Sequence, residues 1–404
     1  KVAHNANYDL TVLGNYNVYP QLPMYDTMIA AHLLGKKTLG LKNLALDLLG
    51  VEMTIITDLI GRGSKQITMA QVPVEKAAPY ASADADMTGR LATLLEGSLR
   101  NQGFWELLST VEMPLVPVLV EMQRHGICLN AKVLYAMSSD LDHKLKELAV
   151  NAYQSVGHEY NLNSPQQLSD VLFNQLGLPK TKRTKTGYST DANALESLKG
   201  AHPVIDHILE YRQLAKLKST YVDSLPELIN PNTGRIHTSY HQAGSSTGRV
   251  SSSDPNLQNI PIRTELGRQV RKAFLAENSP EWLLLSADYS QIELRVLAHL
   301  SQDTGLLEAF HKGEDIHSAT ASMMLDVPLD EINSDHRRIA KVLNFGVIYG
   351  LSAYGISQQT EFSPEQGQKF IDSYFSKYPG IKDYLESVKQ QVREVAYVET
   401  VLGR

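Results

Sequence analysis

Apolar and polar positions in the first half of the chain predict two parts of different character. Residues 1–100 alternate short apolar runs with helical stretches such as Gly40–Gly50, an order typical of α/β domains. From 101 to 230 helical periodicity dominates, and Asn163–Leu168 has the pattern of a capped helix start.

The second half changes pattern again. Within residues 231–300, strand-like sequence occurs at Gly234–Gln242 and at Trp282–Ala287, whereas residues 301–404 have helical periodicity. The four parts together predict a mixed α/β, multidomain protein.

One acidic residue stands where a predicted strand ends and a helix begins. Asp288 follows the apolar run Trp282–Ala287 and opens the segment Asp288–Arg295. A carboxylate at such a turn can hold a divalent metal against a phosphate. The alternative is that Asp288 simply caps the following helix.

A second segment, Arg337–Gly350, places cations and aromatic rings at a spacing of four residues. At about 100° per residue, positions four apart drift by only about 40°, so they form one stripe on a helix. Such a stripe suits a ligand with phosphates at one end and a flat base at the other. The stripe consists of Arg337, Lys341, Phe345 and Tyr349.

An amphipathic core helix with snorkelling cations would give the same spacing. Other residues already supply an apolar face that can be buried in the core, so the stripe is expected to face a cleft or solvent. That apolar face comprises Val342, Leu343, Val347 and Ile348.

The first hundred residues carry their own candidate site. The segment Asn5–Asp9 ends in a carboxylate, and Tyr80 stands four residues before Asp84, one helical turn away on the same face. Two acids can share metals while a phenol orients water in phosphodiester hydrolysis. A structural helix with a buried tyrosine is the alternative.

Charge and composition add little. The chain has 404 residues, 43% hydrophobic and 20% charged, with net charge −6, which is ordinary globular composition for about two to four domains. Its single cysteine, Cys128, excludes an intramolecular disulfide framework and suits a reducing cytoplasm. We find no apolar run long enough to span a membrane and no secretory leader pattern.

Basic residues gather in one Gly/Thr/Ser-rich stretch. This predicted mobile tip could contact a duplex backbone without regard to sequence, or its charge could serve solubility alone. The tip holds Lys180, Lys182, Arg183 and Lys185.

Four segments in order resemble family A DNA polymerases of the bacterial DNA polymerase I type: Tyr211–Tyr221, Thr247–Pro261, Asp288–Arg295 and Arg337–Gly350. The resemblance implies a right-hand polymerase whose thumb and connecting helices occupy 101–230, the first part of the palm 231–300 and the fingers 301–404. Residues 1–100 resemble a partial 3′-5′ exonuclease domain with a ribonuclease-H-like fold.

The resemblance implies two-metal nucleotidyl transfer from dNTPs to a primer 3′-hydroxyl, in DNA replication and repair. Asp288, with the main-chain carbonyl of Tyr289, would hold two Mg²⁺ ions. Arg337 and Lys341 would hold the triphosphate, with His317 as a further phosphate contact.

Other positions would contact the base, the sugar and the DNA. Phe345 would stack near the incoming base, and Tyr349 with Gly350 would lie at the template side. Glu293 would exclude a 2′-hydroxyl, unless it is an ordinary helix glutamate paired with Arg295 or Arg337.

Polar residues around the predicted palm carry donors suited to the primer-template minor groove, although turns could satisfy them equally well. They are Arg249, Asn256, Gln258, Asn259 and Gln291; Gln291 is also expected near the dNTP, and Lys182 and Arg183 near the duplex.

In the exonuclease family, Asp9 and Asp84 would be metal ligands, Tyr80 would position the water and Asn5 would support them. The family's first exonuclease motif and the second palm Asp motif are not in the sequence, so we expect a fragment whose own activity is doubtful. Five other acids are set aside as ligands: Asp26, Asp86, Asp254, Asp315 and Asp335.

Two other classes stay open: a single-subunit RNA polymerase, and a non-catalytic nucleic-acid-binding fragment. The expected partners are primer-template DNA and dNTPs. We further expect a monomer in the bacterial cytoplasm, associated with the nucleoid.

Overall fold

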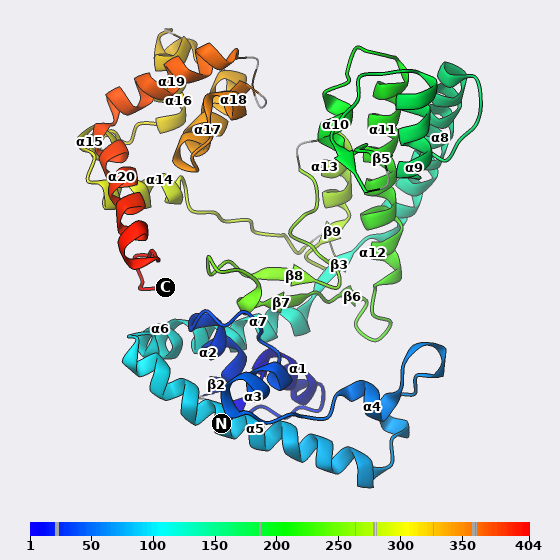
Figure 1. Ribbon diagram of the computed structural model, residues 1–404, viewed down its shortest axis with the longest axis vertical. Helices are drawn as coiled ribbons and strands as arrows, with labels where there is room; N and C mark the ends of the chain where they lie inside the picture. The colour runs from blue at the N-terminus through cyan, green and yellow to red at the C-terminus, as the bar shows by residue number, and fades with distance from the viewer. Residues whose placement is uncertain are drawn as a thin grey trace. The chain divides into compact units, whose positions relative to one another are not determined.

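The computed structural model describes residues 1–20, 24–185, 187–262, 264–277, 279, 281–325, 327–357, 360 and 362–404. It divides into two compact units, Lys1–Leu285 with Val401–Arg404 and Ser286–Thr400 (Figure 1). The inner boundaries expected near residues 100 and 230 stay predictions.

The N-terminal part of the first unit contains one short parallel strand pair, β1 (Val2–Ala3) with β2 (Tyr25–Asp26). The other regular elements of this part are helical, so the predicted α/β pattern is present with few strands. They are α1 (Ala6–Asn15), α2 (Thr27–Leu33), α3 (Leu41–Leu49), α4 (Ile56–Ile60), α5 (Val74–Asn101), α6 (Trp105–Leu107), η3 (Leu108–Glu112) and α7 (Met113–His125), with short turns η1 (Gly63–Lys65) and η2 (Met69–Gln71). The helix expected over Gly40–Gly50 is confirmed as α3.

One buried carboxylate joins α1 and α2. Asp26 is 1% exposed and accepts hydrogen bonds from the main-chain N–H of Asn5 and Ala6 at the start of α1, and of Met28 and Ile29 in α2. Unpaired N–H groups at a helix start are costly when buried. Asp26 therefore has a structural role at the starts of both helices.

The long helix α5 contributes to both a core and a pocket. Leu91, Leu95 and Leu99 recur every four residues on one face and are buried. Tyr80 and Asp84 lie further towards its N-terminus, one turn apart as predicted.

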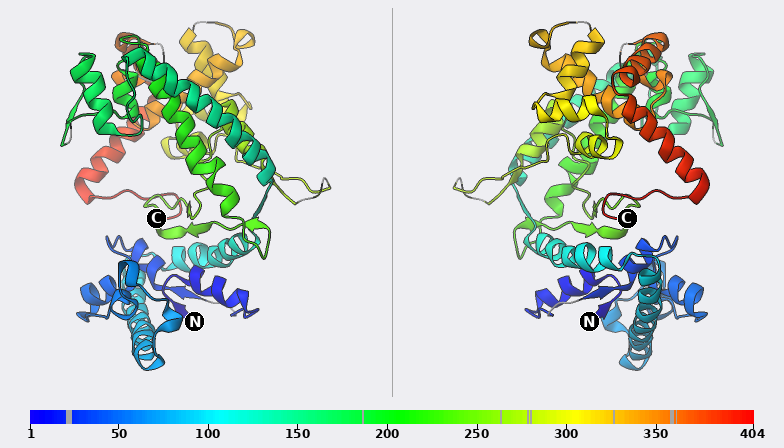
Figure 2. Two further views of the ribbon diagram at one scale, coloured as in Figure 1. Left: turned by 90° about the vertical axis from the view of Figure 1, so that its right-hand side faces the viewer. Right: turned by 90° about the vertical axis from the view of Figure 1, so that its left-hand side faces the viewer.

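The middle of the chain is built on two long helices. The teal α8 (Ala131–Val156) and the green α11 (Val204–Leu217) pack side by side (Figures 1 and 2). Ser164 accepts a hydrogen bond from the N–H of Gln167 at 3.4 Å, which confirms the capped start of α9 (Pro165–Asp170). The remaining elements are η4 (Val171–Gln175), the hairpin β4 (Arg183–Thr184) and β5 (Gly187–Tyr188), α10 (Ala192–Glu196), η5 (Lys218–Val222) and α12 (Ser224–Glu227).

Two small antiparallel sheets follow. One has the order β6 (Arg235–Ile236), β3 (Ile127–Leu129), β9 (Phe274–Leu275), and the other pairs β7 (Ser239–His241) with β8 (Ser251–Ser253). The strand expected over Gly234–Gln242 is thus divided between two sheets. Two helical elements complete the region, η6 (Gln242–Gly244) and α13 (Glu265–Lys272).

The strand predicted for Trp282–Ala287 is wrong. The described residues 282–289 form neither helix nor strand, and Leu283 and Leu285 are 87% and 93% exposed. An apolar sequence forms a strand only where a neighbouring strand completes its hydrogen bonds. Within the described ranges this segment has no such neighbour.

The second unit is helical, as expected for the last hundred residues. Its helices surround one apolar core that includes Leu294, Leu343 and Tyr374. They are α14 (Ile292–Ser301), α15 (Thr304–His311), α16 (Ile316–Leu325), η7 (Leu329–Glu331), α17 (Ser334–Ile348), α18 (Ala353–Ser357), α19 (Pro364–Lys377) and α20 (Pro379–Val395). Among the described residues, no helix combines the length and apolarity needed to cross a membrane.

Candidate functional site

The predicted stripe lies along α17 of the second unit. Arg337 and Lys341 are exposed and Phe345 is half-buried, while Tyr349 follows the last helical residue and is 68% exposed. The opposite face buries Leu343 and Val347 as expected, together with Ala340 and a polar residue that the sequence did not single out, Asn344. The stripe is therefore separate from the core face of its own helix.

Asp315, which precedes α16, connects this stripe to the turn before α14. Its Oδ2 accepts a hydrogen bond from Nε of Arg337 at 2.5 Å, and its Oδ1 accepts one from Nε2 of Gln291 at 3.1 Å. Gln291 is only three residues after Asp288. The candidate metal-binding turn and the candidate phosphate-binding arginine are thus tied to one carboxylate.

His317 lies beneath the stripe rather than on it. The side chain is 2% exposed, and Nδ2 of Asn344 lies 3.0 Å from its Nδ1. The ring lies 5.8 Å from that of Phe345. Burial lowers the pKa of His317, with smaller opposing and reinforcing effects from Asp315 and from Arg337 and Lys341. In this arrangement His317 supports Phe345, and its contact with a phosphate stays a prediction.

Glu293 is held by Tyr349. The phenol donates to Glu293 Oε2 at 2.7 Å, whereas Arg337 pairs with Asp315 and Arg295 donates to the carbonyl of Ser290. The sequence left open a pairing of Glu293 with Arg295 or Arg337. The structure instead pairs Glu293 with Tyr349.

Asp288 and Tyr289 lie on the exposed segment before α14, Tyr289 being 80% exposed. Within the described ranges no group of three or more His, Cys, Asp or Glu side chains is placed to hold a metal ion. The magnesium ligands proposed at Asp288 and at the carbonyl of Tyr289 stay predictions.

The three exonuclease candidates line one pocket of about 810 Å³ in the first unit. Asp9 comes from α1, and Tyr80 and Asp84 come from α5. Asp84 Oδ1 is buried without a hydrogen-bond partner, which fits an acceptor meant for a cation. Partial burial of its carboxyl group and, next, the charge of Asp26 raise the pKa of Asp9.

Two further residues of this pocket were missed. Lys42 in α3 donates to the Tyr80 hydroxyl at 3.1 Å and lies 4.2 Å from the ring centroid. His4 also lines the pocket, and Nδ1 of His4 lies 2.9 Å from Oγ1 of Thr27. The contact of Asn5 with this region runs through its main-chain N–H to Asp26. A lone lysine at a helix start gives no sequence signal for a contact 38 residues away.

The minor-groove candidates of the first unit are partly engaged in turns. Asn256 Oδ1 accepts from the N–H of Gln258 and Asn259, and Gln258 bonds Ser252 and Val250. Asn256 and Asn259 line the same hollow of about 520 Å³. The exposed Arg249 lies before β8.

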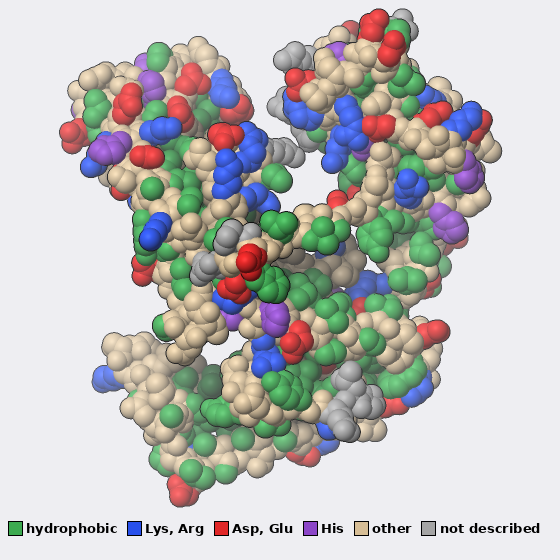
Figure 3. Space-filling model, turned by 180° about the vertical axis from the view of Figure 1, so that it is seen from behind, with side chains coloured by type: hydrophobic (Ala, Val, Ile, Leu, Met, Phe, Trp, Pro, Cys, Tyr) green, Lys and Arg blue, Asp and Glu red, His purple; other side chains and the backbone are tan. Residues whose placement is uncertain are grey.

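The basic tip is a hairpin, with Arg183 in β4 and the exposed Lys180, Lys182 and Lys185 around it. The amino group of Lys180 lies 5.4 Å from the ring centroid of Tyr188. On the face shown in Figure 3, both Lys and Arg side chains and Asp and Glu side chains reach the surface. The hairpin is therefore a local basic patch on a protein that is acidic overall.

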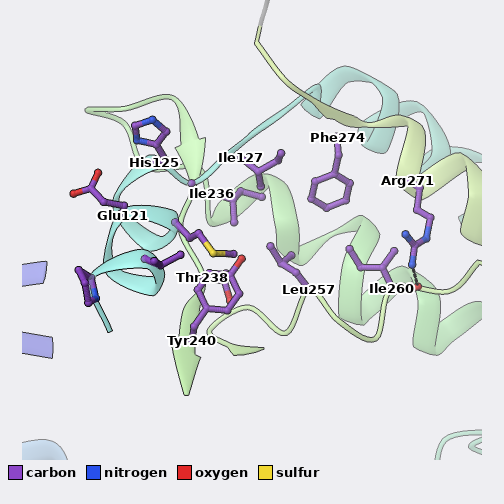
Figure 4. Close-up of a pocket in the computed structure, with 14 residues that line it drawn as sticks. Glu121, His125, Ile127, Ile236, Thr238, Tyr240, Leu257, Ile260, Arg271 and Phe274 are labelled. Atoms are coloured by element: carbon purple, nitrogen blue, oxygen red, sulfur yellow. Dashed lines mark hydrogen bonds between the residues drawn. The ribbon is translucent and has the colours of Figure 1, made fainter. Parts of the chain in front are cut away.

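An apolar hollow of about 880 Å³ lies apart from all these residues. Ile127, Ile236 and Phe274 line it, and Arg271 donates to the carbonyl of Ile260 at one end (Figure 4). None of the predicted site residues faces it.

A family model described as DNA polymerase family A matches residues 131–404. The chain belongs to this family. A second model, described as 3'-5' exonuclease, matches residues 1–100. The resemblance and the fold class drawn from the sequence are confirmed, and the alternative of a single-subunit RNA polymerase is set aside.

Curated relatives include "DNA polymerase I" of Chloroflexus aurantiacus and of Pseudomonas aeruginosa, 48% and 46% identical over the whole of this chain. The chain spans 43% and 45% of their lengths, less than half of each. A solved structure titled "POL domain of Pol1 from M. smegmatis complex with DNA primer-template and dNTP" has a TM-score of 0.86 and 39% identity, covering all of this chain and 68% of that one.

Proposed function

We propose that the family A polymerase region of this chain serves template-directed DNA synthesis, in which a primer 3′-hydroxyl is extended with dNTPs. The observation that carries this proposal is the chain of contacts from Gln291 through Asp315 to Arg337. It holds the arginine of the stripe in a fixed relation to the turn that follows Asp288. A nucleotide needs both, because its phosphates and the metal that binds them meet at one place.

Each residue has a defined part in this proposal. Arg337 and Lys341, both exposed, bind the triphosphate, and the half-buried ring of Phe345 stacks against the base. Tyr349 presents a flat, 68% exposed ring beside the template. Glu293, fixed by Tyr349, occupies the space that a 2′-hydroxyl would need.

Asp288 and the carbonyl of Tyr289 would hold divalent metal, with Mg²⁺ as the expected ion. Such an ion neutralises developing charge on the phosphates during transfer. The exposed carboxylate of Asp288 suits a hard cation that prefers oxygen ligands. Arg337 and Lys341 would neutralise the remaining negative charge of the triphosphate.

The first unit's pocket is proposed as a 3′-5′ proofreading site of this polymerase. Asp9 and Asp84 would bind metal, as the unpartnered Asp84 Oδ1 favours, and Tyr80 would orient the attacking water. Primer-template DNA is the expected partner, with Asn256, Asn259 and the basic hairpin as its contacts. We expect a monomer that acts in the bacterial cytoplasm, on nucleoid DNA.

Nucleotide binding gives the direct test. We expect isothermal titration of the 404-residue chain with dTTP and Mg²⁺ to give saturable binding, and the K341A variant to bind at least roughly tenfold more weakly. K389A is the matched control, because Lys389 pairs with Glu386 on α20 and lies outside the stripe. Equal affinity of K341A and K389A would refute the assignment of the stripe.

Primer extension tests synthesis itself. We expect Mg²⁺-dependent extension with dNTPs, and little with ribonucleotides, from a polypeptide extended at both ends by its flanking coding sequence. DNA binding without extension would instead favour the non-catalytic class.

A further inference from the structure

Asp315 has more hydrogen-bond donors around it than an ordinary surface carboxylate. Besides Arg337 and Gln291, the main-chain N–H of His317 donates to it at 3.0 Å and the hydroxyl of Ser318 at 3.1 Å. Burial works against the charged form, yet these bonds, that of Arg337 first, hold the pKa of Asp315 below its usual value. The carboxylate is therefore charged at neutral pH.

The bond between Asp315 and Arg337 uses one edge of the guanidinium group. Nε donates to Oδ2 at 2.5 Å, and Nη2 lies 3.4 Å from Oδ1. A guanidinium has five N–H donors in a planar fork, so Nη1 and the outer hydrogen of Nη2 remain available. The Arg337 side chain is 44% exposed, and this free edge can bind a phosphate while the other edge stays on Asp315.

The pair contributes little to stability. Ion pairs between partly exposed side chains contribute little to the free energy of folding, and the Arg337 and Asp315 side chains are 44% and 35% exposed. What the pair does fix is direction: an arginine side chain otherwise samples many rotamers, and the entropy of ordering it counts against ligand affinity. A preformed orientation removes that cost.

We propose that Asp315 is a positioning residue for the triphosphate: it orients the Arg337 guanidinium and, through Gln291, fixes it relative to the turn that carries Asp288. This inference rests on the proposed nucleotide site and adds to it a residue that touches neither the nucleotide nor the metal. Asp315 keeps its contact with Arg337 when the triphosphate is bound.

The test compares D315N, D315E and R337A with the wild-type 404-residue chain by titration with dTTP and with inorganic triphosphate, both with Mg²⁺. D335N is the matched control, because Asp335 pairs with Arg338 at 3.4 Å on the same helix α17 but is not part of the network. Thermal unfolding of each variant verifies that the second unit remains folded.

We expect D315N to weaken both ligands by roughly tenfold, the scale of one charge-assisted hydrogen bond. D315E should recover part of the loss, and D335N should bind as the wild type does. The double variant D315N/R337A should bind no more weakly than R337A alone, since Asp315 acts through Arg337.

Three results would overturn the inference. Tighter binding by D315N would make Asp315 a competitor of the phosphates, unchanged binding would make it irrelevant to them, and additive losses in the double variant would make it independent of Arg337. If the wild-type chain binds dTTP, any one of these three results refutes the role of Asp315 but leaves the proposed nucleotide site standing. Absence of dTTP binding by the wild type would refute the proposed nucleotide site as well.

Discussion

The hydroxyl of Tyr349 donates a hydrogen bond to Glu293 Oε2 at 2.7 Å, which joins the end of α17 to the first turn of α14. The tyrosine ring is 68% exposed, so burial does not hold it in place. Polar contacts therefore connect α17 and the start of α14 at both ends of the proposed nucleotide site. At one end Asp315 bridges Gln291 and Arg337, and at the other Tyr349 contacts Glu293.

We expect the E293A variant to lose preference for deoxynucleotides. Removing the carboxylate opens space for a 2′-hydroxyl, so the ratio of dATP to ATP affinity should fall by roughly tenfold. Y349F should shift the ratio in the same direction by less, because Glu293 keeps its bulk and loses a hydrogen bond.

The matched control for this measurement is E308A. Glu308 lies on α15 and pairs with Lys312, the residue that follows this helix. An E293A chain with the wild-type ratio would show that Glu293 does not face the sugar.

We expect D26A to loosen α1 and α2 together. Four main-chain N–H groups lose their acceptor, which should cost about 2–4 kcal/mol of local stability. Hydrogen exchange followed by mass spectrometry reports this for each helix separately. D86A, which removes an exposed carboxylate 3.9 Å from Arg90, should change exchange in neither helix; faster exchange in α2 alone after D26A would contradict the shared role.

His317 should titrate below its unperturbed pKa of 6.5, because burial lowers it. The unfolded chain then binds more protons than the folded one between the two values, so stability should fall as the pH is lowered through 6.5. NMR titration of the histidine rings measures this directly. His158 is the internal control, since hydrogen bonds to the Glu159 carbonyl and to Gln175 raise its pKa. A His317 value above that of His158 would contradict the burial argument.

Mn²⁺ should bind beside Tyr80 and broaden its ring signals in NMR. We expect D84N to abolish the broadening and D86N to leave it, because Asp84 Oδ1 lines the pocket without a partner and Asp86 is exposed. The raised pKa of Asp9 means that protons should displace the ion at a higher pH than for an ordinary aspartate. Equal broadening in D84N and D86N would place the ion elsewhere.

The sequence correctly predicted features that depend only on residues a few positions apart. The spacing of Arg337 and Lys341 fixed their common face because helix geometry alone decides it, and Ser164 capped α9 because the capping bond spans three residues. Tyr80 and Asp84 face one pocket for the same reason.

Features that depend on distant partners were missed or wrong. Trp282–Ala287 has the composition of a strand but no neighbouring strand among the described residues, and composition cannot supply one. The partner of Glu293 lies 56 residues away and that of Lys42 38 residues away. Asp315 was set aside as a metal ligand, and its sequence context gave no sign of its bond to an arginine 22 residues later.

The exposed apolar residues from Trp282 to Leu285 have a practical consequence for anyone who purifies this polypeptide. An extended run of tryptophan and leucine offers a ready template on which a second molecule can add a strand. Self-association should therefore grow with protein concentration, and charged replacements at Leu283 and Leu285 should delay precipitation.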